Sequence, residues 1–584
     1  MATFFMAKST PRSSNIGSSS ASPIVKLADD HLFTIMLLLP VDSLISFAMT
    51  CKRFRSLTTS DTLWESICRR EWGSTSVDAF KSSINTNNNQ QLPWMRLYKQ
   101  VSQLDSFSCH KLPDPDSDLM LPTPRASHSL NFVSDCLVLF GGGREGGQPI
   151  FHLIRCYDSQ IQSLNMLCFL NVPVCVCDAS LFDLLVKDAK VMFILVYACS
   201  LVLPSVPDST NHGLGFHCLR IFLLLDHGFN ILLAAHAVVP LLIMLLECPF
   251  WQLDYWRDLD DTWVAYIGKD FQRMLKWQKV TSGIPSGRFG HTCAVIGENL
   301  VLFGGINDRG MRQNDTWVGQ VVLSENLGIT TLSWRLLDVS SVAPPPRGAH
   351  AACCIDKRTM VIHGGIGLYG LRLGDTWILE ISENFCSGTW IELVAHPSPP
   401  PRSGHTLTCI EGTGTVLFGG RGLGYDVLHD VWLLQASEDQ LKWVQMLYNL
   451  QDIPEGASLP RVGHSATLIL GGRLLIYGGE DSQRHRKGDF WVLDVSKIPS
   501  IKEQSTPLNS RGLQANMWRR LKAKGYKPNC RSFHRACADH SGRRLYVFGG
   551  MVDSLLHPAE ASEMRFDGEL FLVKFELETG AVRC

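Results

Sequence analysis

Histidine, arginine and aspartate recur at fixed spacings along this chain, and these residue types can bind metals or transfer protons. Six arginines are each followed three residues later by a histidine, and five aspartates each stand two residues before a tryptophan. The arginines are Arg125, Arg288, Arg347, Arg402, Arg461 and Arg531, and the aspartates are Asp261, Asp315, Asp375, Asp430 and Asp489. The ligands of one metal ion must cluster, whereas these residues are spread once per unit along the chain. We therefore expect them to join strands and turns by hydrogen bonds, with no catalytic residue and no metal site among them.

The same residues mark an internal repeat that runs through most of the chain. Successive arginines lie 59, 55, 59 and 70 residues apart after a first gap of 163 residues. Each unit continues into an apolar run that ends in Gly-Gly, and in four units a tryptophan follows twelve residues later. Alternating β-branched and aromatic residues, bounded by glycine and proline, predict four short strands per unit, here named A to D in chain order. Four-stranded units repeated radially form a β-propeller, so six units predict six blades.

The sixth unit lacks a strand of its own. Its A, B and C strands read "FHRACAD", "RLYVFGG" and "GELFLVKFEL", and the chain then ends without a tryptophan-bearing D strand. The segment "SFSCHKLPDP" before the first unit resembles the D strand "LKWQKVTSG", with Cys109 in the place of the tryptophan. An open ring would leave an unpaired strand edge. We expect residues 106–113 to supply the missing strand and close the ring.

Residues 27–72 carry apolar residues at helical spacing and predict a small helical domain of three or more helices. The residues that define the first three helices are Leu32, Ile35, Leu38, Leu39, Pro40, Leu44, Cys51, Phe54 and Leu57. Pro40 suits the first turn of a helix, where no backbone N–H is needed. A helical core of this size is marginal by itself, which favours an interface with a partner. Residues 73–104 are expected to form a linker with a helical extension.

Both parts of the chain resemble known families. The repeats resemble kelch repeats, and residues 27–72 resemble an F-box, with a Leu-Pro pair at 39–40, then "CKRFRSL", then "LW". Ala28 stands where the F-box family usually has proline. The architecture resembles plant F-box/kelch proteins. The resemblance implies a mainly β protein, in which a six-bladed kelch β-propeller over residues 105–584 follows a small N-terminal α-helical F-box domain.

The resemblance also implies a function. F-box proteins are substrate receptors of Skp–cullin–F-box ubiquitin ligases, in which the F-box docks on a Skp-type adaptor, and through it on a cullin, while the second domain holds the protein to be ubiquitinated. A receptor of this kind performs no chemistry and needs no cofactor; it raises the concentration of substrate lysines near the ubiquitin-conjugating enzyme. The nine residues that define the helices of the F-box are the predicted adaptor contacts. The expected location is the cytoplasm, the nucleus or both.

Two alternatives accompany this hypothesis. One is a kelch-repeat interaction scaffold that acts outside ubiquitination, and adaptor binding separates it from the ligase hypothesis. The other is a kelch enzyme, such as the copper oxidases or the iron-dependent specifier proteins. The sequence lacks a Glu-x-x-x-Asp-x-x-x-His motif and has no carboxylate or Cys–His set outside the repeat pattern. We therefore expect the chain not to be an enzyme.

The strand order predicts which end of the propeller holds the substrate. If strand B ends at Gly-Gly, the B–C loops lie at one end of the propeller, and the D–A loops share that end. Arginine and tyrosine are enriched among residues that anchor interfaces. The predicted substrate contacts are Arg309, Arg312, Tyr369, Arg372, Arg421, Tyr425, Arg484, His485 and Arg486. The alternative is that these are ordinary solvated loop residues.

Composition restricts the partners. The 584 residues exceed one domain, and a net charge of -1 gives no electrostatic reason to expect nucleic acid or an anionic membrane as partner. The 19 cysteines include no paired C-x-x-C motifs at zinc spacing, which is typical of a reduced intracellular chain. Residues 1–26 are rich in serine, with no acidic residue before Asp29. They predict a disordered leader, with a plastid transit peptide as the alternative.

The first repeat is interrupted by a long segment. Removing residues 148–256 shortens the gap of 163 residues by 109 and restores the period of the repeat. The segment is apolar, and its run "FNILLAAHAVVPLLIMLL" reaches the minimum length of a membrane span. Spanning would separate two strands that must pair, so we expect no membrane. Translated non-coding sequence has this composition, and a retained intron or gene-model error is the favoured explanation over a real insertion. Strands near 137–142 and 261–267 should still pair.

Overall fold

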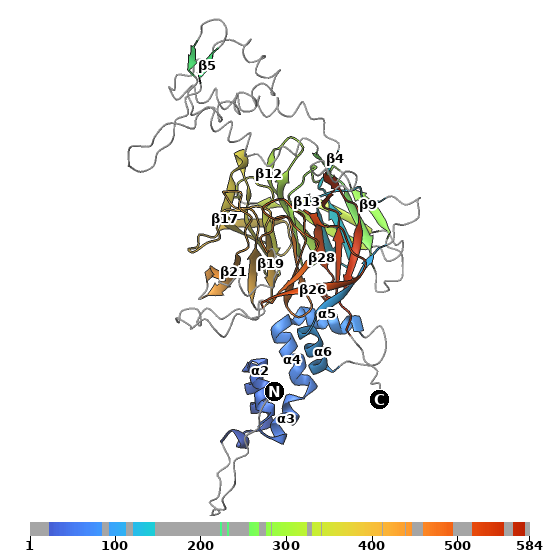
Figure 1. The fold of residues 1–584 in the computed structure, drawn as a ribbon, viewed down its shortest axis with the longest axis vertical. Helices are drawn as coiled ribbons and strands as arrows, with labels where there is room; N and C mark the ends of the chain where they lie inside the picture. The colour runs from blue at the N-terminus through green and yellow to red at the C-terminus, as the bar shows by residue number, and fades with distance from the viewer. Residues whose placement is uncertain are drawn as a thin grey trace, which may run out of the picture.

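The fold was analysed in a computed structural model of the chain, in which a helical module sits at one end of a β-propeller (Figure 1). The residues that the structure describes are 23–84, 93–112, 121–145, 222–224, 230–232, 256–267, 276–281, 283–323, 330–339, 342–411, 413–437, 440–446, 459–494, 517–553 and 564–577. The predicted leader over residues 1–26 and the predicted insertion over 148–256 lie almost entirely outside these ranges. None of the helices within them is both long and apolar enough to span a membrane.

The helical module spans residues 23–102. It contains η1 (Pro23–Lys26), α1 (Asp29–Leu38), α2 (Val41–Ala48), α3 (Lys52–Thr58), α4 (Asp61–Trp72), α5 (Ser74–Ile84) and α6 (Trp94–Ser102). Pro40 is the residue before α2, where its fixed φ suits the start of a helix. Gly73 ends α4 with a φ of 87°, which residues with a Cβ rarely adopt. The helices pack around a common core that includes Leu32, Leu63 and Ile67.

The propeller has six antiparallel blades, and the predicted fold class is confirmed. Blade 1 is β2 (Ser129–Val133), β3 (Cys136–Phe140), β8 (Thr262–Tyr266) and β9 (Trp277–Thr281); blade 2 is β10 (Thr292–Ile296), β11 (Asn299–Ile306), β12 (Arg312–Leu323) and β13 (Thr330–Leu336). Blade 3 is β15 (Ala351–Cys354), β16 (Thr359–Ile366), β17 (Arg372–Ile381) and β18 (Ser387–Glu392), extended by β14 (Asp338–Val339). Blade 4 is β19 (Thr406–Ile410), β20 (Gly414–Phe418), β21 (Val431–Ser437) and β22 (Gln440–Met446).

Blades 5 and 6 form one continuous sheet. Blade 5 is β23 (Ser465–Ile469), β24 (Arg473–Tyr477), β25 (Phe490–Leu493) and β26 (Trp518–Gly525); blade 6 is β28 (Arg535–Ala538), β29 (Arg544–Phe548), β32 (Leu570–Lys574) and β1 (Ser106–Lys111). The strand β1 pairs antiparallel with β32 and parallel with β26. Cys109 pairs with Val573, the register that a tryptophan occupies in the D strands of the other blades, so the start of the propeller provides the outer strand of its last blade.

Short strands extend the B–C loops of blades 1 and 6, and one more hairpin lies between blade strands in the sequence. In blade 6, β27 (Arg531–Ser532), β30 (Met551–Asp553) and β31 (Met564–Phe566) form a small sheet. In blade 1, β4 (Gly143–Glu145) pairs with β7 (Trp256–Asp258). The separate hairpin of β5 (Phe222–Leu224) and β6 (Asn230–Leu232) lies between β4 and β7 in the sequence. The strand β3 pairs with β8 from Cys136–Tyr266 to Phe140–Thr262, as expected from the sequence. The blade therefore closes across the long segment between them.

A ring of backbone hydrogen bonds joins the six blades at their centre. The ring residues are those immediately before the repeated histidines: Ser127, Gly290, Ala349, Gly404, Gly463 and Phe533. Each donates its N–H to the carbonyl oxygen of the preceding blade's ring residue over 2.6–2.9 Å, and Ser127 closes the cycle by donating to Phe533. All six have positive φ, between 53° and 69°. Five carry side chains no larger than serine, so only Phe533 places a large side chain at the centre.

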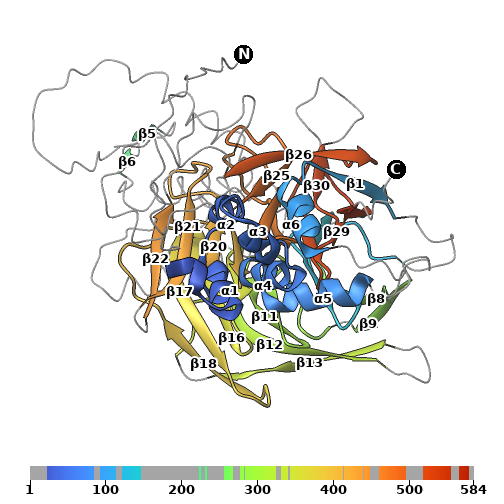
Figure 2. The ribbon, with the colours of Figure 1, turned by 90° about the horizontal axis from the view of Figure 1, so that it is seen from below.

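The helical module is fixed to the A–B end of the propeller, and Figure 2 shows the helices lying over this end. Leu470, in the A–B turn of blade 5, is buried in the helical core. A Cβ on the neighbouring Gly471 would approach Cγ1 of Val101 to 2.5 Å, so this close contact needs glycine. Arg519 donates from Nη1 to the carbonyl oxygens of Ser102 at 3.1 Å and Leu104 at 3.0 Å. These contacts place the helices opposite the B–C loops.

Candidate functional site

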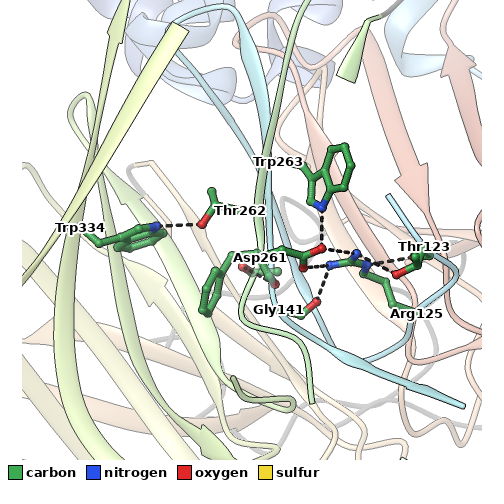
Figure 3. A network of polar contacts seen from close by, with 9 residues as sticks. Thr123, Arg125, Gly141, Asp261, Thr262, Trp263 and Trp334 are labelled. Atoms are coloured by element: carbon green, nitrogen blue, oxygen red, sulfur yellow. Dashed lines mark hydrogen bonds and ion pairs between the residues drawn. The ribbon is translucent and has the colours of Figure 1, made fainter. Parts of the chain in front are cut away.

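The repeated charged residues form a buried network within each blade, shown for blade 1 in Figure 3. Arg125 donates from Nη1 to Oδ1 of Asp261 at 2.6 Å and from Nη2 to Oδ2 at 3.0 Å. Trp263 donates from Nε1 to the same carboxylate at 2.7 Å. The arginine is fully buried, and its Nη1 also reaches the carbonyl oxygen of Gly141 at 3.0 Å. The network therefore ties the start of strand A to the end of strand B and the start of strand C.

The other blades repeat this network. In blades 2–5 the arginine–aspartate pairs are Arg288–Asp315, Arg347–Asp375, Arg402–Asp430 and Arg461–Asp489, with closest separations of 2.6–2.7 Å. In blade 6, Arg531 pairs instead with Glu569 at 2.7 Å and Asp567 at 3.2 Å. Burial alone would raise the pKa of Asp261, but the hydrogen bonds and charge of Arg125 lower it below its ordinary value. A carboxylate held in this way stays ionised, and both of its oxygens accept hydrogen bonds within the blade. Its role is therefore structural.

The repeated histidines are also structural. His350 packs under the preceding blade's Gly-Gly turn, where a Cβ on Gly304 would come within 3.1 Å of its Cε1. Burial, followed by the charge of the nearby arginine, lowers the pKa of these histidines, for example that of His464 to about 3. They are therefore neutral at physiological pH. Within the described ranges, no three His, Cys, Asp or Glu residues are grouped so that they could hold a metal ion.

Acidification should destabilise the propeller from about pH 6.5 downward, well before its carboxylates titrate. The unfolded chain protonates each histidine below pH 6.5, whereas folded His464 stays neutral to about pH 3. Unfolding then takes up protons, and each such histidine costs about 1.4 kcal/mol of stability per pH unit in this window. Above pH 6.5 the histidines contribute no pH dependence. Urea midpoints at pH 7.5, 6.5 and 5.5 measure the effect, and equal midpoints at all three would contradict neutral buried histidines.

The structure places the nine predicted substrate contacts on the B–C loops in three environments. Arg309, Tyr369, Arg484 and His485 are exposed; Arg312, Arg421, Tyr425 and Arg486 are half-buried; Arg372 is buried. The guanidinium of Arg372 lies 4.4 Å from the ring centroid of Tyr425, which links blades 3 and 4. Arg421 pairs with Glu480 of blade 5 at 3.2 Å, and Arg486 pairs with Asp553 of blade 6. The less exposed members therefore stiffen this end of the propeller, whereas the exposed ones are free to meet a partner.

Exposed apolar side chains stand beside these residues, and all of them except Tyr369 were absent from the sequence-based prediction. Met311, Leu368, Leu371 and Leu423 are between 50% and 61% exposed, and Tyr369 is 70% exposed. They lie on the B–C loops of three consecutive blades. In blade 3 the cluster of Leu368, Tyr369 and Leu371 between Gly-Gly and Asp-x-Trp is the signal that could have identified them, whereas Met311 and Leu423 stand singly in their loops. Apolar surface gathered on a rigid face is typical of a protein-binding site.

Backbone conformation supports the same face. Tyr369, Tyr425 and Arg484 have φ values of 58°, 61° and 64°, and each lies in a B–C loop. Gly310 occupies the left-handed conformation in the corresponding loop of blade 2, with a φ of 71°. A bulky residue in this conformation costs about 1–3 kcal/mol, and such residues concentrate at functional sites. We therefore define the B–C face by the exposed residues Arg309, Met311, Leu368, Tyr369, Leu371, Leu423, Arg484 and His485.

The nine predicted adaptor contacts divide between the core and the surface of the helical module. Leu32, Leu44 and Phe54 are at most 3% exposed and pack within the module. Ile35, Leu39, Cys51 and Leu57 are half-buried, whereas Leu38 and Pro40 are exposed. The first three can influence a partner only by holding the helices in place. Leu38, at 80% exposed, is available for direct contact.

Two further apolar residues of this module face solvent. Ile45 in α2 and Met49, the residue that caps its C-terminus, are 58% and 75% exposed, and their spacing of four residues places them on one side of the helix. The sequence analysis predicted a contact for the neighbouring Leu44 and none for Ile45 or Met49. The signal for Ile45 and Met49 is that this segment carries more apolar residues than one buried stripe can hold. Together with Leu38, they form the exposed apolar set of α1 and α2.

An F-box-like helical domain followed by kelch repeats defines a class of protein, and comparisons place the chain in it. A family model described as "F-box-like" matches residues 29–70, and one described as "KLHDC2/KLHL20/DRC7 Kelch-repeats domain" matches residues 290–495. The chain is 50% identical over 582 residues to "F-box/kelch-repeat protein At1g51550" of Arabidopsis thaliana, covering 98% of this chain and 96% of the relative. The chain therefore belongs to the F-box/kelch-repeat protein family.

More distant relatives share the domains only in part. "Adagio-like protein 3" of Oryza sativa is 30% identical over 300 residues, which are 50% of this chain and 42% of that protein. "Adagio protein 3" of Arabidopsis thaliana is 29% identical over 302 residues, which are 50% of this chain and 43% of that protein. The match thus spans less than half the length of these relatives, so the similarity supports the shared domains alone.

Proposed function

We propose that this chain is a non-catalytic substrate receptor of a Skp–cullin–F-box ubiquitin ligase, acting in the cytoplasm, the nucleus or both. The F-box would dock on a Skp-type adaptor, and through it on a cullin, by means of the exposed apolar set of α1 and α2. The B–C face of the propeller would hold the protein to be ubiquitinated. The F-box and kelch domains, together with the full-length F-box/kelch relative, support this proposal.

One structural observation carries the proposal: the helices pack directly on the propeller, and the two exposed surfaces lie at its opposite ends. The helices pack on the A–B end through Leu470, Gly471 and Arg519, and the B–C face is at the other end. A fixed separation lets a receptor hold its substrate at a constant position relative to the adaptor. Proximity of this kind raises the effective concentration of substrate lysines without any chemistry by the receptor.

The B–C face offers both kinds of contact that anchor a protein segment. Its apolar side chains can be desolvated, and the exposed Arg309 and Arg484 can pair with acidic groups. Arg372, Arg421 and Arg486 are already paired or stacked between blades, so they preorganise the loops. A preorganised face loses less conformational entropy when its partner binds. We therefore expect substrate capture by this face without large movement of its loops.

Replacing Tyr369 and Leu371 with aspartate should abolish substrate ubiquitination while adaptor binding persists, because two desolvated anchors are lost. The test compares ubiquitinated peptides in cells expressing the wild-type chain, this double variant, or the control Tyr266→Asp. Tyr266 is 54% exposed and ends a C strand on the far side of the propeller from the B–C face. Substrates are the proteins whose ubiquitination rises with the wild type and the control only. An identical set of ubiquitinated proteins for the double variant would contradict the assignment of this face.

A further inference from the structure

Among the described residues at the centre of the propeller is an arginine that the blade networks do not use. Arg535 follows the repeated histidine of blade 6, at the first position of β28. The corresponding residues of blades 1–5 are small: Ser129, Thr292, Ala351, Thr406 and Ser465. The six A strands contact one another in a closed cycle, so these positions surround the centre. Blade 6 thus places a guanidinium where the other blades place a hydroxyl or a methyl group.

Arg535 has no acidic partner within the part of the chain that the structure describes. Its Nε donates to the carbonyl oxygen of His128 at 2.8 Å, and no described carboxylate forms an ion pair with it. Arg531, four residues earlier, pairs with two carboxylates. Burial lowers the pKa of Arg535 to about 10, so the side chain remains charged at neutral pH. Its charge also contributes to the lowered pKa of the central histidines His128, His291, His350, His464 and His534.

An unpaired cation held among protein groups is costly, and an anion that pairs with it would recover this cost. The side chain is half-buried, so it is accessible to a ligand. The terminal nitrogens of a guanidinium form two parallel hydrogen bonds to a carboxylate or a phosphate. The Nη1 and Nη2 groups of Arg535 donate to no described residue, which leaves this edge of the guanidinium available. The hydroxyls of Thr292 and Thr406 instead contact the histidines of the next blades.

Phe533 stands two residues before Arg535, in the central hydrogen-bond ring, and packs against Met551 and Phe566. It adopts a φ of 55°, a strained conformation for an aromatic residue. Its ring covers Gly463, where a Cβ would come within 2.9 Å of the phenyl carbons. The phenyl ring therefore extends over the neighbouring blade at the centre, and it is only half-buried. Phe533 and Arg535 are both half-buried at the start of the same A strand, so a group bound by Arg535 would have Phe533 as its apolar neighbour.

We propose that the centre of the propeller binds one oxyanion group, a carboxylate or a phosphate, with Arg535 as its cation and Phe533 as its apolar neighbour. This inference rests on the proposed function only for the identity of the molecule that carries the anion. That molecule would be an acidic or phosphorylated segment of the captured protein. The site itself does not depend on that carrier. Binding of small oxyanions therefore tests the site separately from adaptor binding, and the two ideas can fail independently.

The experiment measures thermal unfolding of the full-length chain in acetate, inorganic phosphate or chloride at equal ionic strength. We expect acetate or phosphate to raise the unfolding midpoint by about 2 °C over chloride, once the anion is in roughly tenfold excess over its Kd. A larger rise with phosphate would identify a phosphorylated carrier, and a larger rise with acetate an acidic side chain. No rise with either anion would overturn the proposal.

Three variants assign the response to Arg535. Arg535→Gln should lose the response, Arg535→Lys should keep a reduced one, and Arg309→Gln, which alters an exposed arginine of the B–C face, should keep it in full. In chloride, Arg535→Gln should be at least as stable as the wild type, because an unpaired charge is removed. A response retained by Arg535→Gln would overturn the proposal. Unfolding of Arg535→Gln in chloride would also overturn it, because the arginine would then be structural.

Discussion

Replacing Ile45 and Met49 together with aspartate weakens binding of a Skp-type adaptor by at least about 100-fold, while the chain remains folded. Both side chains are more than half exposed on one side of α2, so they contribute little to the helical core. An apolar interface would instead bury them, and an aspartate at its centre would leave an unpaired charge without water. Titration calorimetry with the purified adaptor measures the loss.

The matched control lies on the same helix. Ser46 is an exposed residue of α2, and Ser46→Asp introduces one negative charge between the two apolar positions without removing an anchor. We expect this control to bind within a few-fold of the wild type. Leu44→Ala should differ from both, because Leu44 is 1% exposed and its loss would unfold the module as well as weaken binding. Equal affinity of the double variant and the wild type would exclude α2 from the adaptor interface.

Phe107→Ala lowers the free energy of unfolding of the propeller by about 3–5 kcal/mol, an effect expected for a buried phenyl group. Phe107 is 2% exposed in β1, and its ring lies 4.7 Å from that of Phe490 in blade 5 and 6.0 Å from that of Phe575. The strand β1 therefore joins the last two blades through its core side as well as through backbone hydrogen bonds. Weakening β1 exposes the outer edge of β32 and opens the ring of blades. Denaturant unfolding measures the loss.

The control is His110→Ala on the same strand. His110 is exposed and pairs with Leu572, so its removal should change stability by less than about 0.5 kcal/mol. Hydrogen exchange should show where the damage lies: in Phe107→Ala, protection should fall first in β26, β29 and β32. Uniform protection with unchanged stability would mean that β1 is not needed to close the propeller.

Much of the blade architecture could be predicted from the sequence because each blade repeats the same local signals. The Gly-Gly pairs mark turns where Gly141 and Gly142 adopt positive φ, and the Arg125–Asp261 pair bridges residues 136 positions apart in the chain. The contact could be predicted despite this long separation because the same Arg–Asp pair recurs 27 or 28 positions apart in four other blades. The pairing of β3 with β8 followed from this logic.

Features without repetition could not be predicted in the same way. Whether Leu44 or Ile45 faces the helical core depends on how α2 packs against its neighbours, and the segment is apolar on both sides. The contact of Leu470 with the helical module joins two domains through a turn whose sequence has no special signal. The exposed loop residues and the unpaired Arg535 depend on which groups lie nearby in space. These contacts and exposures depend on residues that are distant in the sequence, so no local sequence pattern reveals them.

The most direct test of the ligase hypothesis is whether the full-length chain assembles with a Skp-type adaptor and a cullin. Light scattering coupled to size-exclusion chromatography would determine the mass of the mixture. We expect a single complex containing one copy of each protein, lost in the Ile45→Asp/Met49→Asp variant and retained in Ser46→Asp. A folded chain that elutes alone, with adaptor and cullin in a separate peak, would contradict the ligase hypothesis and favour a kelch scaffold that acts outside ubiquitination.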